Sequence, residues 1–241
     1  MSKLLVKSAF TVGLLAMLMA VPVYGASVNK SIKVEAGSES DGASTVNGSV
    51  SVGEGAVVTG TLKTVNGKIR VDEKATIQDA TTVNGSLSIA DNVKARDLTT
   101  VNGSVRVGEG ATVSGEISAV NGRIQLESGT SVGADVGNVN GDIEFEGSEV
   151  SGNVKTVSGD IELTDAAVIK GDLIIQKPST WGWGNKKSRV PTVTIGPGSR
   201  VEGVILLERE IKLYISETAE VGGVEGEMSM SDAVRFDGAR P

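Results

Sequence analysis

Thr45-Val46-Asn47-Gly48 decides the fold, because this tetrapeptide returns along the chain at nearly constant intervals. It recurs at residues 64–67, 82–85 and 100–103, and close variants follow at 119–122, 138–141 and 156–159. The starts of these units lie 19, 18, 18, 19, 19 and 18 residues apart. A fixed period of this kind is typical of an architecture in which equal units stack on one another.

A second motif occurs inside the units and extends the repeat in both directions. Val-Gly-Glu-Gly-Ala-x-Val-x-Gly is present at residues 52–60 and 107–115, and related frames follow at 195–203 and 215–223. Residues 28–34 match residues 46–52, which lie 18 residues later in the first full unit. We therefore expect about ten stacked coils between the N-terminal leader and Val224.

Apolar and polar residues alternate within each unit, which predicts short strands with one buried face and one wet face. We expect Ser49, Ser51, Lys68 and Arg70 to point outward. The residues that we expect to point inward in the first two units are Val46, Val50, Val52, Ala56, Val58, Leu62, Val65, Ile69, Val71, Ala75 and Ile77.

The period of 18 to 19 residues divides into three sides, which predicts an all-β fold: a three-sided, single-stranded parallel β-helix. Coils about 4.8 Å apart would make a rod about 45 Å long. The handedness of parallel crossovers favours a right-handed coil, whereas the Ile-Gly-Pro-Gly stretch at 195–198 is typical of left-handed hexapeptide coils.

The Asn-Gly pair of each unit predicts a corner. Glycine accepts a positive φ without steric cost, and stacked asparagines can hydrogen-bond from coil to coil. An alternative interpretation treats the Thr-x-Asn pairs, such as Thr64 and Asn66, as an ice-binding array. The predicted structural ladder consists of Asn47, Asn66, Asn84, Asn102, Asn121 and Asn140, with Asn29 before it and Ser158 after it.

The repeat is interrupted once. Leu163 and Ile195 hold equivalent positions but lie 32 residues apart, so about 14 residues, roughly 177–190, are inserted at a corner. Insertions in solenoids form surface loops that often carry the function. The loop either folds back onto the coils or contacts a glycan or protein partner. The candidate contact residues are Trp181, Trp183, Lys186, Lys187 and Arg189.

Composition excludes several classes of function. The chain has no Cys and no His, which rules out disulfides, thiolate metal sites and Ser-His-Asp catalysis. A net charge of −7 disfavours nucleic acid. We assign no catalytic, cofactor-binding or metal-binding residue and expect no enzymatic activity. Asp142 and Glu144 share an outward strand face, and a pair of carboxylates could serve a carbohydrate-active enzyme or a weak calcium site. These two functions are the alternatives.

The first residues resemble a signal peptide. Lys3 and Lys7 precede an apolar run at residues 9–23, and cleavage is expected between Gly25 and Ala26. An uncleaved anchor is the alternative, although the run is short for a membrane span. The expected organisation is a signal peptide at 1–25, a solenoid at 26–227 with the insertion at about 177–190, and a tail at 228–241. Polar residues at 35–40 suggest a partial cap at one end of the rod, and the tail would cover the other.

The units resemble two bacterial families. Thr-Val-Asn-Gly repeats are similar to those of adhesin-like β-strand-repeat proteins of unknown function. The Val-Gly-x-Gly-Ala-x-Val-x-Gly frames at 52–60, 107–115 and 195–203 resemble bactofilins, whose cytoplasmic β-helices polymerise end to end. The resemblance covers roughly residues 28–224 and implies a self-assembling rod without catalytic residues. The leader and the tryptophan-containing insertion depart from bactofilins.

The sequence therefore predicts an exported, non-enzymatic structural protein of the cell envelope, in the periplasm or on the surface of a Gram-negative bacterium. Its partners would be further copies joined end to end, or an envelope glycan or protein. No membrane span is expected after cleavage of the leader. The alternative function is an adhesin or a glycan- or peptidoglycan-binding module that acts through Trp181 and Trp183.

Overall fold

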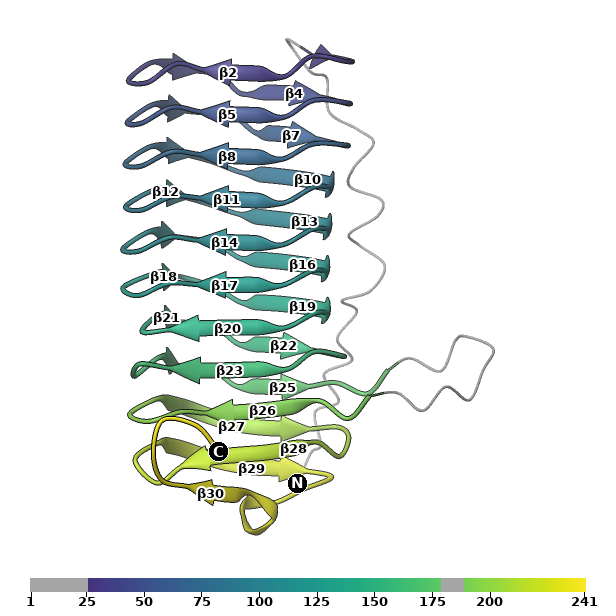
Figure 1. Cartoon of the computed structure of the whole chain (residues 1–241), viewed down its shortest axis with the longest axis vertical. Helices are drawn as coiled ribbons and strands as arrows, with labels where there is room; N and C mark the ends of the chain where they lie inside the picture. Colours follow the sequence, from purple (N-terminus) through teal and green to yellow (C-terminus); the bar gives the residue numbers. More distant parts are fainter. Residues whose placement is uncertain (1–25, 179–188) are drawn as a thin grey trace, which may run out of the picture.

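The computed structural model describes residues 26–178 and 189–241, and it confirms the predicted all-β parallel solenoid. Successive coils stack along one axis, and strands cross that axis at every level (Figure 1). Each coil contributes three short strands, which form three files along the rod. Within these described ranges, no helix is long and apolar enough to cross a membrane.

The first file is a parallel sheet of 11 strands. Partners in this sheet are mostly 18 or 19 residues apart, as Val50 is from Ile69 and Ile69 from Leu87. Its strands are β2 (Ile32–Val34), β5 (Val50–Val52), β8 (Ile69–Val71), β11 (Leu87–Ile89), β14 (Val105–Val107), β17 (Ile124–Leu126), β20 (Ile143–Glu146), β23 (Ile161–Thr164), β26 (Thr192–Ile195), β28 (Lys212–Ser216) and β30 (Val234–Phe236).

The second and third files belong to one sheet of 19 strands. The second file holds β3 (Glu39–Ser40), β6 (Val57–Val58), β9 (Thr76–Ile77), β12 (Lys94–Ala95), β15 (Thr112–Val113), β18 (Ser131–Val132), β21 (Glu149–Val150) and β24 (Val168–Ile169). The third holds β1 (Ala26–Ser27), β4 (Ala43–Thr45), β7 (Leu62–Thr64), β10 (Ala80–Asn84), β13 (Leu98–Asn102), β16 (Ile117–Asn121), β19 (Val136–Asn140), β22 (Val154–Thr156) and β25 (Leu173–Ile175). Near the C-terminus β27 (Arg200–Leu207) and β29 (Glu220–Gly226) run through both files.

The insertion does not disturb the stacking. Leu163 of β23 pairs directly with Ile195 of β26, although 32 residues separate them. The coil therefore resumes in register after the inserted segment, as the repeat frame predicts.

The core is a narrow column of stacked small and branched side chains. Val50, Val52 and Leu62 are fully buried, and so are their counterparts in the following coils. The expectation that Val46 and Val65 join this core is wrong. Val46 is 40% exposed, Val65 is half-buried, and the preceding threonine points inward instead. These valines still form a file along the rod, but the file lies on its outer surface.

Glycine at the main corner is required by close packing more than by its backbone angle. A Cβ on Gly85 would lie 1.8 Å from the carbonyl oxygen of Gly67, and a Cβ on Gly67 would lie 1.9 Å from that of Gly48. Neither of these glycines has a positive φ, although Gly122 and Gly141 of the same column do. The prediction that a positive φ explains this column is therefore wrong for most of its members.

The two ends of the rod differ. At the C-terminal end the segment after β29 includes the short 3-10 helix η2 (Met230–Asp232) and β30, which pairs with β28. Met228 accepts the Ile211 N–H through its sulfur at 3.3 Å, and Phe236 is 8% exposed. This end of the core is covered by the chain itself (Figure 1).

At the N-terminal end, the described strands β1, β2 and β3 each pair on one side only, with β4, β5 and β6. Residues 35–40, predicted as a partial cap, belong to the first coil itself. Glu39 and Ser40 form β3 in register with Val57 and Val58, so this stretch is part of an ordinary coil.

Candidate functional site

The inserted segment leaves the column after β25 and returns at β26, and its described flanks are fixed to neighbouring coils. On the departing side the Lys177 N–H donates to Glu208 Oε2 at 3.0 Å. On the returning side one Asp160 carboxylate pairs with the Arg189 guanidinium at 2.5 Å and accepts the Thr192 N–H at 2.9 Å. Two carboxylates thus hold the two flanks of the insertion.

A guanidinium adds a third attachment at the same place. Arg209 donates to the backbone carbonyl of Arg189 at 3.1 Å and to that of Val157 at 3.4 Å. Because it bonds one flank of the insertion to the preceding corner, Arg209 fixes the direction in which the chain re-enters the coil.

Four of the predicted contact residues, Trp181, Trp183, Lys186 and Lys187, lie outside the described residues. The fifth, Arg189, lies at the base, where its side chain is 75% exposed while it pairs with Asp160. The structure therefore describes how the loop is anchored at its base.

The corner asparagines form a continuous ladder on the surface. Each donates its side-chain amide to the side-chain oxygen of the asparagine one coil earlier, over 2.8 to 3.1 Å. Ser158 continues the column through a bridge to Asn140. The ladder runs in the order Asn29, Asn47, Asn66, Asn84, Asn102, Asn121 and Asn140.

The threonine column lies inside the rod. Thr64, Thr82 and Thr100 are fully buried, and each donates its hydroxyl to the corner carbonyl of the preceding coil, as Thr64 does to Gly48 at 2.8 Å. A buried hydroxyl that is already hydrogen-bonded cannot meet a crystal surface. The ice-binding interpretation of the Thr-x-Asn pairs is therefore wrong.

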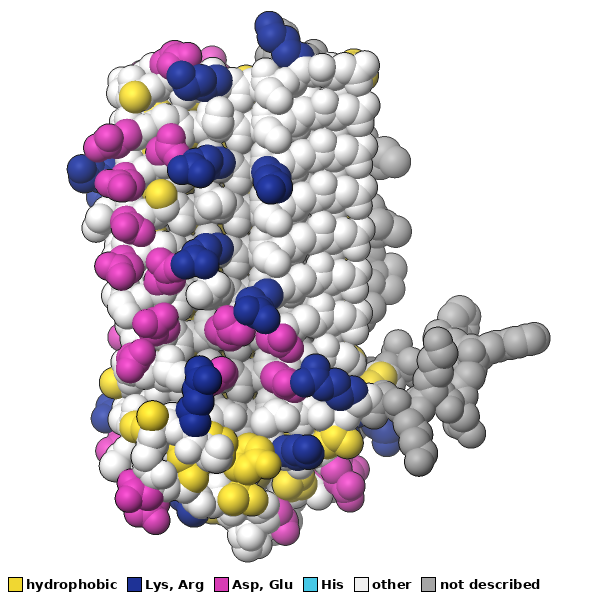
Figure 2. Space-filling view, viewed as in Figure 1, with side chains coloured by type: hydrophobic (Ala, Val, Ile, Leu, Met, Phe, Trp, Pro, Cys, Tyr) yellow, Lys and Arg dark blue, Asp and Glu magenta, His cyan; other side chains and the backbone are white. Residues whose placement is uncertain are grey.

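The acidic residues that kept an enzymatic alternative open lie on the outer face of the first file, as expected. Arg123 pairs with Glu144 at 3.2 Å and with Asp142 at 3.7 Å, so both carboxylates have a cationic partner. Figure 2 shows acidic side chains beside basic ones in the lower half of this face. Within residues 26–178 and 189–241 no group of three or more acidic side chains is placed to hold a metal ion.

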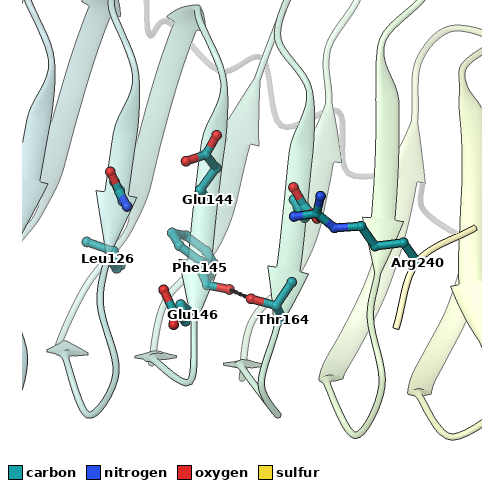
Figure 3. Close-up of a pocket in the computed structure, with 8 residues that line it drawn as sticks. Leu126, Glu144, Phe145, Glu146, Thr164 and Arg240 are labelled. Atoms are coloured by element: carbon teal, nitrogen blue, oxygen red, sulfur yellow. Dashed lines mark hydrogen bonds and ion pairs between the residues drawn. The ribbon is translucent and has the colours of Figure 1, made fainter. Parts of the chain in front are cut away.

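An open hollow of about 180 Å³ lies on this face between β17, β20 and β23. Glu144, Glu146 and Glu162 line it, and Arg240 from the C-terminal segment reaches over it to Glu162 at 3.6 Å (Figure 3). The hollow is a shallow acidic depression, and a basic side chain of the same molecule already lies across its edge.

A second polar column precedes the strands of the third file and was missed from the sequence. Asp135 accepts the backbone N–H of Asn153 at 2.8 Å and pairs with Lys155 at 2.5 Å. Burial alone would raise the pKa of Asp135, but the hydrogen bonds from Lys155 and Asn153 together lower it below its ordinary value. The same 18- to 19-residue period could have revealed this column, whose members include Asp79, Asp97, Asp135, Asn153 and Asp172.

Comparison with known proteins gives a single family. Residues 72–179 match the family model described as Toastrack DUF4097, a domain of unknown function. The matched segment runs from the end of β8 to just beyond β25, so it covers the middle coils of the solenoid. No curated protein and no solved structure matches the chain.

Proposed function

We propose that this solenoid, whose middle coils match the Toastrack model, is an exported, non-enzymatic structural rod of the Gram-negative cell envelope. The observation that carries the proposal is the unbroken stacking of the core from β2 to β28, including the step across the insertion. Each coil buries its apolar side chains only against its neighbours, so the column resists bending and presents long flat faces.

Export to the periplasm or the cell surface is supported by the leader, whose expected cleavage site lies between Gly25 and Ala26. Removal of residues 1–25 would leave the described strands intact, and among these strands the outer edge of the first coil has no partner.

That edge supports association of rods end to end. The Ile32 N–H and the Val34 carbonyl bond toward β5, so strand alternation turns the backbone groups of Lys33 to the open side. An unpaired strand edge is a template for another strand. Because the C-terminal end is covered by its own tail, a single open end predicts a head-to-head pair rather than a filament.

Cell fractionation and sedimentation of the mature protein test this function together. We expect the chain in the periplasmic or surface fraction, as a discrete pair of rods whose amount rises with concentration. Lys33→Pro removes the outward N–H without touching the bonds to β5, so it should abolish end-to-end pairing, whereas Lys33→Gln should not. A cytoplasmic location, or a turnover activity that is lost on substituting Asp142 or Glu144, would contradict the proposal.

The anchored insertion supports the alternative, a glycan- or peptidoglycan-binding module. Asp160, Glu208 and Arg209 fix the flanks of the loop, and a fixed base lowers the entropy lost when a loop binds. Aromatic faces such as those of Trp181 and Trp183 stack on sugars. Binding to purified peptidoglycan should fall on Trp181→Ala with Trp183→Ala and persist on exchange to Phe. Equal retention of all three proteins would exclude this module.

A further inference from the structure

Three parallel columns of residues run along the outer side of the first file, and the charge of the middle column changes sign half-way along the rod. The column two residues later includes buried positions such as Gly53, Gly108 and Ser216. Residues of the middle column pair in register from coil to coil. Its N-terminal half is basic, with serines between the cations. In order from the N-terminal end, its first five members are Lys33, Ser51, Arg70, Ser88 and Arg106.

The C-terminal half of the same column is acidic and then uncharged. Arg70 and Arg106 in the other half have side chains 70% and 59% exposed, while Glu162 is 36% exposed. Both signs of charge are therefore available at the surface. The next five members are Gln125, Glu144, Glu162, Thr194 and Tyr214, and the uncharged Val234 of β30 follows as the eleventh.

We propose that this face binds a second copy of the chain, antiparallel, about a two-fold axis that runs along the strands between Arg106 and Gln125. Under that symmetry the third member of one copy meets the eighth of the other, so Arg70 faces Glu162. The fourth meets the seventh, which places Ser88 opposite Glu144. Arg106 then lies opposite Gln125.

The two flanking columns agree with the same axis. In the column two residues earlier, Lys68 faces Asp160. In the column two residues later, Glu127 faces Gly108 and Glu146 faces Ala90, each a small uncharged residue. Over the first ten strands of this file, from β2 to β28, no two charges of the same sign in these three columns lie opposite each other. Complementary potentials of this kind fix the register of an interface and exclude wrong ones.

The geometry of the rods suits this pairing. Two identical solenoids share one coil spacing of about 4.8 Å, so opposed side chains stay in step along the whole face. A face about 45 Å long and 15–20 Å wide offers about 700–900 Å² per copy, which is the size of a standard interface. The contact is polar and partly neutralised within each copy, so it should be weak and strongly dependent on salt.

The C-terminal tail competes with the second copy. Arg240 reaches Glu162 from within the same chain, in the place that Arg70 of the other copy would take (Figure 3). Loss of the Arg240 side chain should therefore strengthen pairing rather than weaken it.

Charge exchange tests the lateral pairing in the Lys33→Pro background, in which end-to-end association is removed, with sedimentation velocity of the mature protein at low and high salt as the readout. Arg70→Glu alone and Glu162→Lys alone each oppose like charges and should weaken association by about tenfold or more. An equimolar mixture of the two variants restores both opposite-charge contacts and should associate like the wild type. Arg240→Ala should associate more tightly. If the mixture associates no better than either variant alone, the proposal is overturned.

Cross-linking locates the contact independently of end-to-end association. The chain has no cysteine, so Ser88→Cys and Glu144→Cys introduce single thiols. A mixture of these two variants should form a disulfide across the interface, whereas Ser88→Cys alone should not, because its copies lie three coils apart. Self-cross-linking of Ser88→Cys would show parallel pairing and contradict the axis. Lys33→Pro should leave the cross-link unchanged, so failure of the end-to-end proposal is distinguished from failure of this one.

Discussion

Asn84 donates its side-chain amide to the side-chain oxygen of Asn66 at 2.8 Å, although 18 residues separate the two along the chain. Asn84 also accepts the amide of Asn102 at 2.9 Å, so one side chain links three coils. The contact is repeated along the corner and joins coils that otherwise bond through their backbones. It is the most regular side-chain relationship in the molecule.

Substitution of a ladder asparagine should lower the free energy of unfolding more in the middle of the ladder than at its end. Asn84→Ala breaks two side-chain hydrogen bonds and should lower the free energy of unfolding by about 1–2 kcal/mol. Asn29→Ala breaks one bond, to Asn47, and should cost about half as much. Urea denaturation measures both. Equal effects of the two substitutions would contradict this dependence on the number of ladder bonds broken.

Glycine at the corner should tolerate no side chain. Gly85→Ala places a Cβ 1.8 Å from the Gly67 carbonyl oxygen, and the backbone must move to admit it. We expect a loss of about 3 kcal/mol by the same denaturation assay. Gly55 is the matched control, because it has φ +65° but open space around its Cβ, so Gly55→Ala should cost only about 1 kcal/mol of backbone strain. A larger loss at Gly55 would favour the positive-φ explanation.

The buried hydroxyl column has a gap that can be filled. Ala119 is fully buried at the position of Thr100, so it supplies no hydroxyl for the Gly103 carbonyl. Ala119→Thr should donate such a bond, and Ala119→Val has the same shape without the hydroxyl. The threonine variant should be more stable than the valine variant by about 1 kcal/mol in thermal or chemical unfolding. Equal stability would mean that the column does not depend on this hydrogen bond.

Acid should destabilise the rod partly through Asp135. Its pKa is lowered in the folded state, so its contribution is present above the unfolded pKa of about 3.9 and is lost as the pH falls through the folded value. Asp135→Asn should therefore flatten the fall in unfolding free energy below about pH 4. Lys155→Met should have a similar effect on the pH profile, because it removes the cation that pairs with this carboxylate. An unchanged profile in both variants would exclude Asp135 as a source of the acid sensitivity.

The period of the sequence was sufficient to predict the fold, because equal units can bury their apolar faces only by stacking. It failed at the orientation of single residues beside the corner. Counting Val46 as buried followed hydrophobicity alone, whereas alternation from Ala43 through Thr45 turns the valine outward. Thr45 is the inward residue because its hydroxyl reaches the Lys30 carbonyl at 2.9 Å.

Contacts at the insertion and the ends were harder to foresee. The pairing of Asp160 with Arg189 spans 29 residues and depends on where the chain re-enters the coil, which no repeat encodes. The contact between Arg240 and Glu162 depends on the path of the tail. Such contacts arise once in the molecule, so periodicity gives no information about them.

Spin-label distances test the central claim, that each coil adds one equal step along the rod. The chain has no cysteine, so pairs of cysteines can be introduced to carry the spin labels. One label stands at Ser51 and the other at Gln125, Glu162 or Thr194, which lie four, six and seven coils away. We predict separations that rise as about 19, 29 and 34 Å, with only one coil's step between Glu162 and Thr194 despite the insertion. Separations that do not rise in proportion to coil number, or a jump at Thr194, would contradict the stacked column.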